Sequence, residues 1–224
     1  MPRVRNPVWL ASVALLLAAA GFGALLATRL RQPPLPPPAA APAAVIPERR
    51  PDVTLADLTG RPRSLSEWDG RALVINFWAT WCAPCRREIP MLNELAAELA
   101  PQGTEVIGIA VDFRKDVQAF IERMPIAYQT LIGEQEGMDA ARAFGVTTVV
   151  LPFTVFTDRT GRIVTLHIGE LHRPQADAIL DAVRRIDGGE LTMAAARQRI
   201  EADLAGIRDR DSNRRGSTAG RSAG

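Results

Sequence analysis

The sequence has very little of the residue types that build metal sites and disulfide-stabilised domains. Its 224 residues include two cysteines, two histidines and one tyrosine, and Lys115 is the only lysine. A scaffold of several disulfides is therefore excluded. A tetrahedral zinc site is disfavoured, because the cysteines would need two further ligands and the histidines, His167 and His172, lie far downstream. Cys82 and Cys85 remain as candidates for a redox pair.

The chain also lacks an excess of charge of either sign. Its 27 basic and 25 acidic residues leave a net charge of +2, and the arginines are scattered along the chain. This distribution predicts no nucleic-acid partner. The length and a hydrophobic content of 47% favour one domain with a single core, plus appendages.

A long run without charged residues begins close to the amino terminus. Residues 8–27 contain no Asp, Glu, Lys or Arg, and about 20 apolar residues match the hydrocarbon thickness of a bilayer. We therefore expect residues 1–7 to be a short amino-terminal segment and residues 8–30 to be a transmembrane anchor. A cleaved secretory signal is the alternative, since Arg3 and Arg5 precede the run, but the run exceeds the usual length of about 7–15 residues.

A stretch rich in proline and alanine follows the predicted anchor. We expect residues 31–51 to form an extended linker that holds a domain away from the bilayer. The charges alone do not fix the orientation of the anchor, because arginines flank both of its ends.

From residue 52 onward, short apolar runs alternate with stretches of helical periodicity, which is typical of an α/β domain. We assign residues 52–187 to this domain and residues 188–207 to a helical extension. Residues 208–224 have almost nothing to bury, and we expect a disordered tail there. After a short hairpin-like opening, the expected strands are 73–77, 105–111, 128–132, 153–157 and 163–168. The expected helices are 82–99, 116–123, 137–144, 174–186 and 191–207.

Cys82 and Cys85 stand at the start of a predicted helix, shortly after the apolar strand 73–77. Thiol-disulfide exchange needs an attacking thiolate, a nearby second thiol and a means of stabilising negative sulfur. The N–H groups and dipole at a helix N-terminus favour an anion at Cys82, and Cys85 lies one turn further along. Pro84 suits the first helical turn, since it has no N–H that would lack a partner there. Chance spacing is the alternative for a bare Cys-x-x-Cys, and the strand-loop-helix context argues against it.

The run NFWATWCAPCRREIP, residues 76–90, resembles the thioredoxin superfamily, and within it the membrane-anchored group of TlpA, ResA and CcmG-like proteins. The resemblance covers about residues 52–186 and implies an α/β, thioredoxin-like fold: a central mixed sheet flanked by helices, here with an N-terminal transmembrane helix. It implies that Cys82 attacks, that Cys85 resolves the mixed disulfide, and that Trp81 shapes the surface around them. No cofactor is implied, because the electrons travel on the two sulfurs.

Further residues take candidate roles from the same resemblance. Glu88 lies one turn after the second cysteine; a matching glutamate in ResA-like proteins tunes the pKa values of the cysteines, and a solvated helix glutamate is the alternative. Asn76 stands where thioredoxin has a buried aspartate, which implies that this proton shuttle is absent. Pro152 is expected to follow a cis peptide bond and to face the dithiol, with an ordinary strand-start proline as the alternative. Leu151 is expected to contact substrate backbone, and the bulky run 147–151 leaves the substrate open.

The resemblance implies a thiol-disulfide oxidoreductase that takes electrons from a membrane donor and reduces disulfides of exported proteins, with apocytochromes in cytochrome c maturation as one candidate substrate. Together with the amino-terminal anchor, it suggests a single-pass protein of the cell inner membrane whose domain lies in the periplasm or an equivalent extracytoplasmic space. A peroxiredoxin-like peroxidase would need Pro and Thr where Ile75 and Ala79 stand. A copper chaperone would show a wider cysteine spacing, and a non-catalytic anchored binding module is opposed by the intact dithiol.

Overall fold

The computed structural model describes residues 46–148 and 150–219. The segments predicted at 1–7 and 8–30 lie outside these residues, as does most of the predicted linker. Among the helices of the described part, none is both long enough and apolar enough to cross a membrane.

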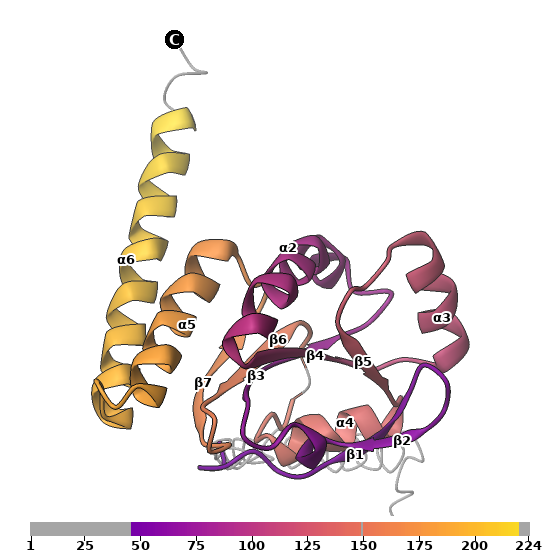
Figure 1. Cartoon of the computed structure of the whole chain (residues 1–224). Helices are drawn as coiled ribbons and strands as arrows, with labels where there is room; N and C mark the ends of the chain where they lie inside the picture. Colours follow the sequence, from indigo (N-terminus) through magenta and orange to yellow (C-terminus); the bar gives the residue numbers. More distant parts are fainter. Residues whose placement is uncertain (1–45, 149, 220–224) are drawn as a thin grey trace, which may run out of the picture. The chain divides into compact units, whose positions relative to one another are not determined.

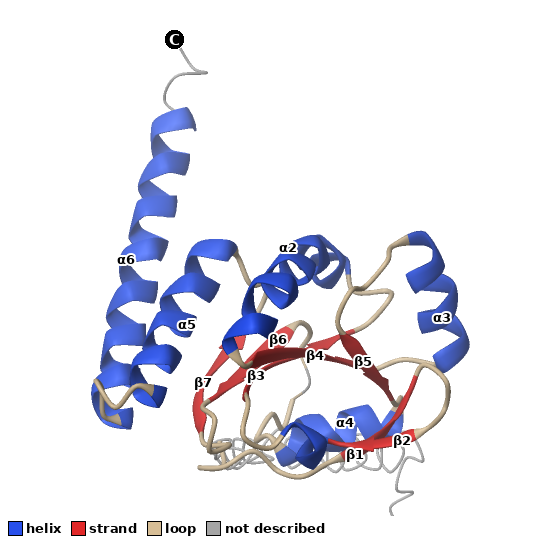
Figure 2. Cartoon of the chain, viewed as in Figure 1, coloured by secondary structure: helices blue, strands red, loops and turns tan. Residues whose placement is uncertain are grey.

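A seven-stranded mixed sheet forms the centre of the domain (Figures 1 and 2). Its strands are β1 (Thr54–Asp57), β2 (Pro62–Ser64), β3 (Ala72–Trp78), β4 (Thr104–Ala110), β5 (Gln129–Ile132), β6 (Phe153–Thr157) and β7 (Ile163–Ile168). Their order across the sheet is β2-β1-β5-β4-β3-β6-β7. Strands β3, β4 and β5 are parallel to one another, and all other pairings are antiparallel. The sheet confirms the predicted α/β class, and β6 and β7 have the predicted bounds.

Helices cover both faces of this sheet. They are η1 (Leu65–Trp68), α2 (Ala83–Leu99), η2 (Ala100–Gln102), α3 (Arg114–Arg123), α4 (Gln135–Ala143), α5 (Arg173–Asp187) and α6 (Met193–Ala219). Helices α2, α3 and α5 lie on one face, and α4 and η1 lie on the other (Figure 1). Alternate residues of β3 therefore enter different cores: Val74 lies in the cluster of Leu92 from α2, and Ile75 in that of Ala140 from α4. Burial on both faces explains why every residue of this strand except Asn76 is apolar.

Helix α6 is longer than the sequence suggested. It continues to Ala219, past the expected end at residue 207, so the structure corrects the disordered tail of residues 208–224 to helix over residues 208–219. The hydrogen bonds of a helix close within the segment itself, so a polar stretch can continue a helix without burying side chains. The first half of α6 is anchored, because Ala196 and Ile200 are buried in the same core cluster as α5.

The same helix also covers the beginning of the edge strand β7. The Arg197 guanidinium donates hydrogen bonds to the carbonyl oxygens of Ile163 at 2.8 Å and Val164 at 3.1 Å. The N–H of Ile163 donates to the Glu48 carbonyl oxygen at 2.8 Å. Polar backbone groups that an edge strand leaves unpaired are therefore satisfied here.

Candidate active site

The two cysteines form a disulfide at the amino-terminal end of α2, with their Cα atoms 5.3 Å apart. Cys82 is the N-cap residue of the helix, and its sulfur accepts a hydrogen bond from the backbone N–H of Cys85 at 3.3 Å. Cys82 keeps 5% of its surface exposed and Cys85 keeps none. An N–H at the more accessible sulfur, together with the helix dipole, favours Cys82 as the thiolate after reduction.

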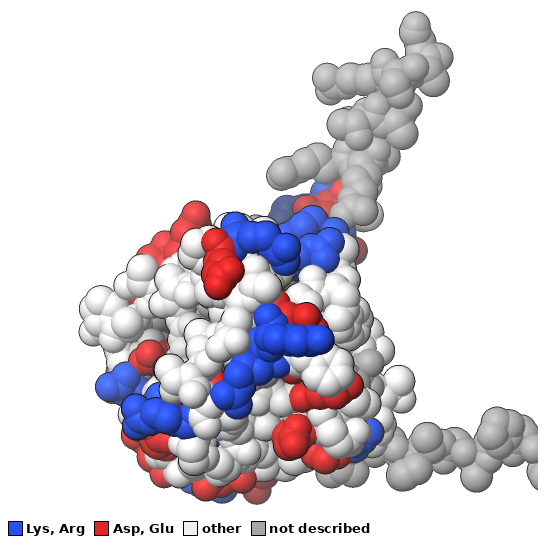
Figure 3. Space-filling model, turned by 90° about the vertical axis from the view of Figure 1, so that its right-hand side faces the viewer, with Lys and Arg blue, Asp and Glu red and all other residues white. Residues whose placement is uncertain are grey.

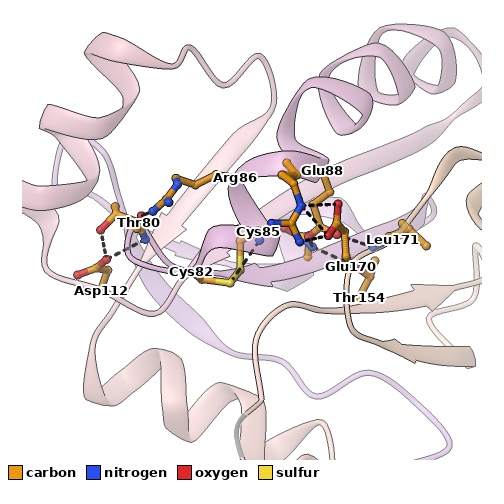
Figure 4. The surroundings of a disulfide bond; sticks show 11 residues. Thr80, Cys82, Cys85, Arg86, Glu88, Asp112, Thr154, Glu170 and Leu171 are labelled. Atoms are coloured by element: carbon orange, nitrogen blue, oxygen red, sulfur yellow. Dashed lines mark hydrogen bonds and ion pairs between the residues drawn. A yellow bond between two sulfur atoms is a disulfide. The ribbon is translucent and has the colours of Figure 1, made fainter. Parts of the chain in front are cut away.

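The loop that carries Cys82 is held by a carboxylate from the segment that follows the neighbouring strand β4. The backbone N–H and the hydroxyl of Thr80 donate to Asp112 Oδ2 at 3.0 and 2.6 Å (Figure 4). The next residue after Thr80, Trp81, is 67% exposed. Sequence reasoning missed the Thr80–Asp112 pair. A carboxylate at the carboxyl end of a strand beside β3 was a signal for it, since loops at that edge of a parallel sheet meet.

The predicted cis peptide bond is present between Leu151 and Pro152. Leu151 is half-buried and packs against the core cluster that includes both cysteines. The carbonyl oxygen of Pro152 accepts a hydrogen bond from the N–H of Gly169 at 2.8 Å, which ties this loop to the end of β7. The predicted site residue Leu151 thus packs against the cluster that contains the dithiol, and Pro152 follows it directly in the chain.

Glu88 is buried on α2, one turn beyond Cys85, with 2% of its surface exposed. One carboxylate oxygen accepts from Asn76 Nδ2 at 2.8 Å, and the other accepts from the backbone N–H of Leu171 at 2.6 Å. Burial raises the pKa of Glu88 to about 7 against the lowering effect of these two hydrogen bonds. The alternative of a solvated helix glutamate is therefore excluded.

Other polar groups lie around this carboxylate. Asn76 also donates to Thr154 Oγ1 at 3.0 Å. Tyr128 is buried, and its burial together with the charge of Glu88 raises the pKa of the phenol well above its ordinary value. Three buried side-chain atoms in the described part of the chain have no hydrogen-bond partner: Asn76 Oδ1, Trp78 Nε1 and the Tyr128 hydroxyl. Gly108 leaves room for two of these residues, because a Cβ there would lie 2.9 Å from Tyr128 Cε2 and 3.1 Å from Trp78 Nε1.

An ion pair at the surface reinforces the contact between α2 and Leu171. The Nε of Arg87 lies 2.9 Å and 3.1 Å from the two carboxylate oxygens of Glu170, and a second guanidinium nitrogen contacts the same carboxylate. Arg87 and Glu170 directly neighbour Glu88 and Leu171 in the chain. The ion pair and the buried hydrogen bond therefore join the same two segments (Figure 4).

The dithiol lies between two hydrogen-bonded pairs, Thr80 with Asp112 on one side and Glu88 with Leu171 on the other (Figure 4). Among the described residues, no group of three His, Cys, Asp or Glu side chains is placed to hold a metal ion. The arrangement provides an accessible sulfur, a buried second sulfur and a buried carboxyl group that can hold or release a proton near neutral pH.

Comparison with known proteins identifies a family and named relatives. Residues 46–166 match the AhpC/TSA family. The chain is 33% identical over 135 residues to the thiol-disulfide oxidoreductase ResA of Geobacillus thermodenitrificans, a match that covers 60% of this chain and 75% of that protein. It is 31% identical over 140 residues to the thioredoxin-like protein YneN of Bacillus subtilis, covering 60% of this chain and 78% of that protein.

Solved structures show the same fold. A thiol:disulfide interchange protein assigned as DsbE, from Chlorobium tepidum, superposes with a TM-score of 0.54 and 26% identity, over 62% of this chain and 95% of that one. A secreted thiol-disulfide isomerase from Corynebacterium glutamicum superposes with a TM-score of 0.51 and 22% identity, over 76% of this chain and 98% of that one. At this level of identity the second match supports the thioredoxin-like fold alone.

Glu88→Gln should change how stability depends on pH. The carboxyl of Glu88 moves from an ordinary pKa of 4.5 to about 7 on folding, so the folded protein holds a proton that the unfolded chain has already released. The wild-type protein should therefore lose stability as pH rises from 4.5 through 7, by about 3 kcal/mol in all, and the variant should not. Denaturant unfolding of the oxidised protein at several pH values measures this. Glu94→Gln, an exposed change on the same helix, should follow the wild type, and equal slopes for Glu88→Gln and wild type would contradict the prediction.

Proposed function

The chain belongs to the AhpC/TSA family and is a thiol-disulfide oxidoreductase, and we propose that it acts in the reducing direction, on disulfides of exported proteins. The observation that carries this direction is the burial of Glu88 one turn from the disulfide. Above its pKa of about 7 Glu88 is negative and opposes a thiolate at the start of the same helix, so it destabilises the reduced dithiol relative to the disulfide. A destabilised reduced form gives up its electrons more readily, which is the property of a reductant.

The proposed reaction has two exchange steps. In the first, the Cys82 thiolate attacks one sulfur of the substrate disulfide, the substrate S–S bond breaks, and the other substrate sulfur leaves as a thiolate. In the second, Cys85 loses its proton and attacks the Cys82 sulfur, which releases the second substrate thiolate and forms the Cys82–Cys85 disulfide. Two electrons pass to the substrate, and a membrane electron donor restores the dithiol. Glu88, with its pKa near 7, is placed to take the proton of the buried Cys85.

The remaining candidate residues have proposed roles on the surface around the sulfurs. The exposed Trp81 indole offers apolar contact next to the attacking cysteine. Leu151 packs against the core cluster that contains the cysteines, and its backbone is proposed to contact the substrate chain, next to the cis bond before Pro152. Pro84 occupies the first turn of α2 and adjusts the reduction potential together with Ala83. Apocytochromes in cytochrome c maturation are one candidate substrate.

A peroxidase is the less supported alternative within the same fold. Ile75 and Ala79 occupy the positions at which a peroxiredoxin-like site needs Pro and Thr, and both side chains are fully buried and apolar. Neither side chain can donate a hydrogen bond to a bound peroxide. The relatives named above are called a thiol-disulfide oxidoreductase and a thioredoxin-like protein, which also favours disulfide exchange.

Cys85→Ser should trap substrates, because a mixed disulfide on Cys82 can no longer be resolved. Mass spectrometry of the trapped species should identify exported proteins, and Cys82→Ser, the matched control, should trap none because the attacking sulfur is absent. The wild-type protein should reduce the trapped substrates. If Cys85→Ser traps nothing and the wild type reduces no protein disulfide, the proposed function fails. If the reduction potential of the Cys82–Cys85 pair is near that of strong oxidants, about −120 mV, the proposed direction of electron transfer is reversed.

Glu88→Gln should move the reactivity of the thiols towards lower pH. With the negative charge removed, the thiolate is no longer opposed by a neighbouring carboxylate, so the pKa of the attacking thiol falls. The rate of Cys82 alkylation in the reduced protein, measured from pH 5 to 9, reports this shift. Glu94→Gln should keep the wild-type profile. An unchanged profile in Glu88→Gln would leave Glu88 with a structural role alone.

Membrane anchoring is part of the same proposal and is supported by the uncharged run of residues 8–27. The domain should lie on the exported side of a single-pass anchor at residues 8–30, joined to it by the linker at residues 31–51. Protease added to cells with a permeabilised outer layer should digest the domain while a cytoplasmic marker stays intact. Protection of the domain under these conditions would contradict this orientation.

A further inference from the structure

A groove of about 640 Å³ is lined in part by Trp81, the residue that precedes the attacking cysteine in the chain. One wall is formed by Thr80, Trp81 and Arg86 from the active-site loop and the first turns of α2. The other wall is α3, which contributes Asp116, Phe120 and Arg123 among others. Figure 3 shows the side of the molecule on which α3 lies, where basic side chains gather between acidic ones. A chain segment that reaches the sulfur of Cys82 can therefore enter this groove as well.

The inner part of the groove is apolar and rigid. Phe120 is buried, and its ring lies 5.4 Å from that of Trp78, so α3 is fixed against β3. The Trp81 indole on the rim has the largest exposed fraction, 67%, among the large hydrophobic residues that the structure describes. Thr80 is held by Asp112. The groove is thus preformed, and binding in it costs little ordering of the protein.

The charges in the groove are unequal. Two guanidinium groups, Arg86 and Arg123, face one carboxylate, Asp116. Neither arginine forms an ion pair within the described part of the chain. Arg86 Nη1 donates to the Thr80 carbonyl oxygen at 2.9 Å, which fixes the guanidinium while other N–H groups of the same fork stay available. Arg123 is exposed at the end of α3.

From this geometry we propose that the groove binds an acidic side chain, Asp or Glu, that the substrate protein carries close to the disulfide being reduced. The inference rests on the proposed function and adds a substrate class to it. Arg86 and Arg123 bind the carboxylate, and Trp81 contacts an apolar neighbour of the acidic residue. Two residues of extended chain span about 7 Å, so the acidic residue lies within a few positions of the target cysteine. Charge complementarity of this kind selects substrates and speeds their encounter.

Three peptides with the same intramolecular disulfide test the proposal. They carry Glu, Gln or Lys two positions outside each cysteine and are otherwise identical. Reduction of each peptide by the reduced full-length protein is followed by chromatography of acid-quenched samples. Each rate constant is divided by the rate constant for reduction of the same peptide by dithiothreitol. This normalisation removes differences in the intrinsic reactivity of the peptides. The Glu peptide should react about tenfold faster than the Lys peptide at low salt, and the ratio should fall towards one at about 0.5 M NaCl.

Arg123→Glu should reverse this order, so that the Lys peptide reacts faster than the Glu peptide. Within each variant the ratio between peptides is independent of thiol reactivity, because both peptides meet the same thiolate. Arg114→Glu is the matched control with the same change of charge, since Arg114 lies on α3 but lines a different pocket, and it should keep the wild-type ratio. Arg86→Gln should reduce the ratio and provides a second test if Arg123→Glu fails to fold.

Equal normalised rates for the three peptides in the wild type would overturn the groove proposal, as would an unchanged order in Arg123→Glu. Either result leaves the proposed function intact, because the peptides are still reduced. If the wild-type protein reduces none of the peptides and no protein disulfide, the proposed function itself is contradicted. The two failures are therefore distinguishable.

Discussion

The buried carboxylate of Glu88 is the interaction on which the geometry of this site depends. It joins three parts of the chain: Glu88 from α2, the amide of Asn76 from β3 and the backbone N–H of Leu171 before α5. A carboxylate with 2% exposure must have hydrogen-bond partners, since an unpaired buried charge is very costly. The three parts therefore cannot move independently, and the start of α2, with its two sulfurs, is held against the end of the sheet.

The same carboxylate couples the redox state of the two sulfurs to the protonation of Glu88. In the oxidised protein the sulfurs carry no charge, and Glu88 with a pKa of about 7 is partly protonated at neutral pH. Reduction introduces two thiols at the start of the same helix, and Cys85 is one turn from Glu88. Where two acids interact, a pKa measured after reduction belongs to the interacting groups together and not to one residue alone. The Arg87–Glu170 ion pair joins α2 to the segment of Leu171, one of the two hydrogen-bond partners of Glu88.

Much of the fold and part of the site could be predicted from sequence, because the signals were local. The strands at 153–157 and 163–168 matched their predicted bounds, and the dithiol and the cis bond before Pro152 followed from a specific motif and its resemblance. The partners of Glu88 could not be predicted, since Leu171 contributes only a backbone N–H from 83 residues away. The end of α6 was missed for another reason. The polar sequence indicates that this segment has little to bury. The backbone hydrogen bonds of a helix form within the segment itself, so the helix can continue without a buried face.

The contact between Arg197 and the carbonyl oxygens of β7 closes one border of the sheet. At the opposite border, β2 is three residues long and begins with a proline, which gives another chain little to pair with. Among the residues that the structure describes, the beginning of β7 and the short β2 therefore offer a second copy few free backbone groups for strand pairing. The loop at the carboxyl end of β3 carries the sulfurs and the exposed Trp81, so the accessible apolar surface next to the dithiol is at this end of the sheet and not along its edges.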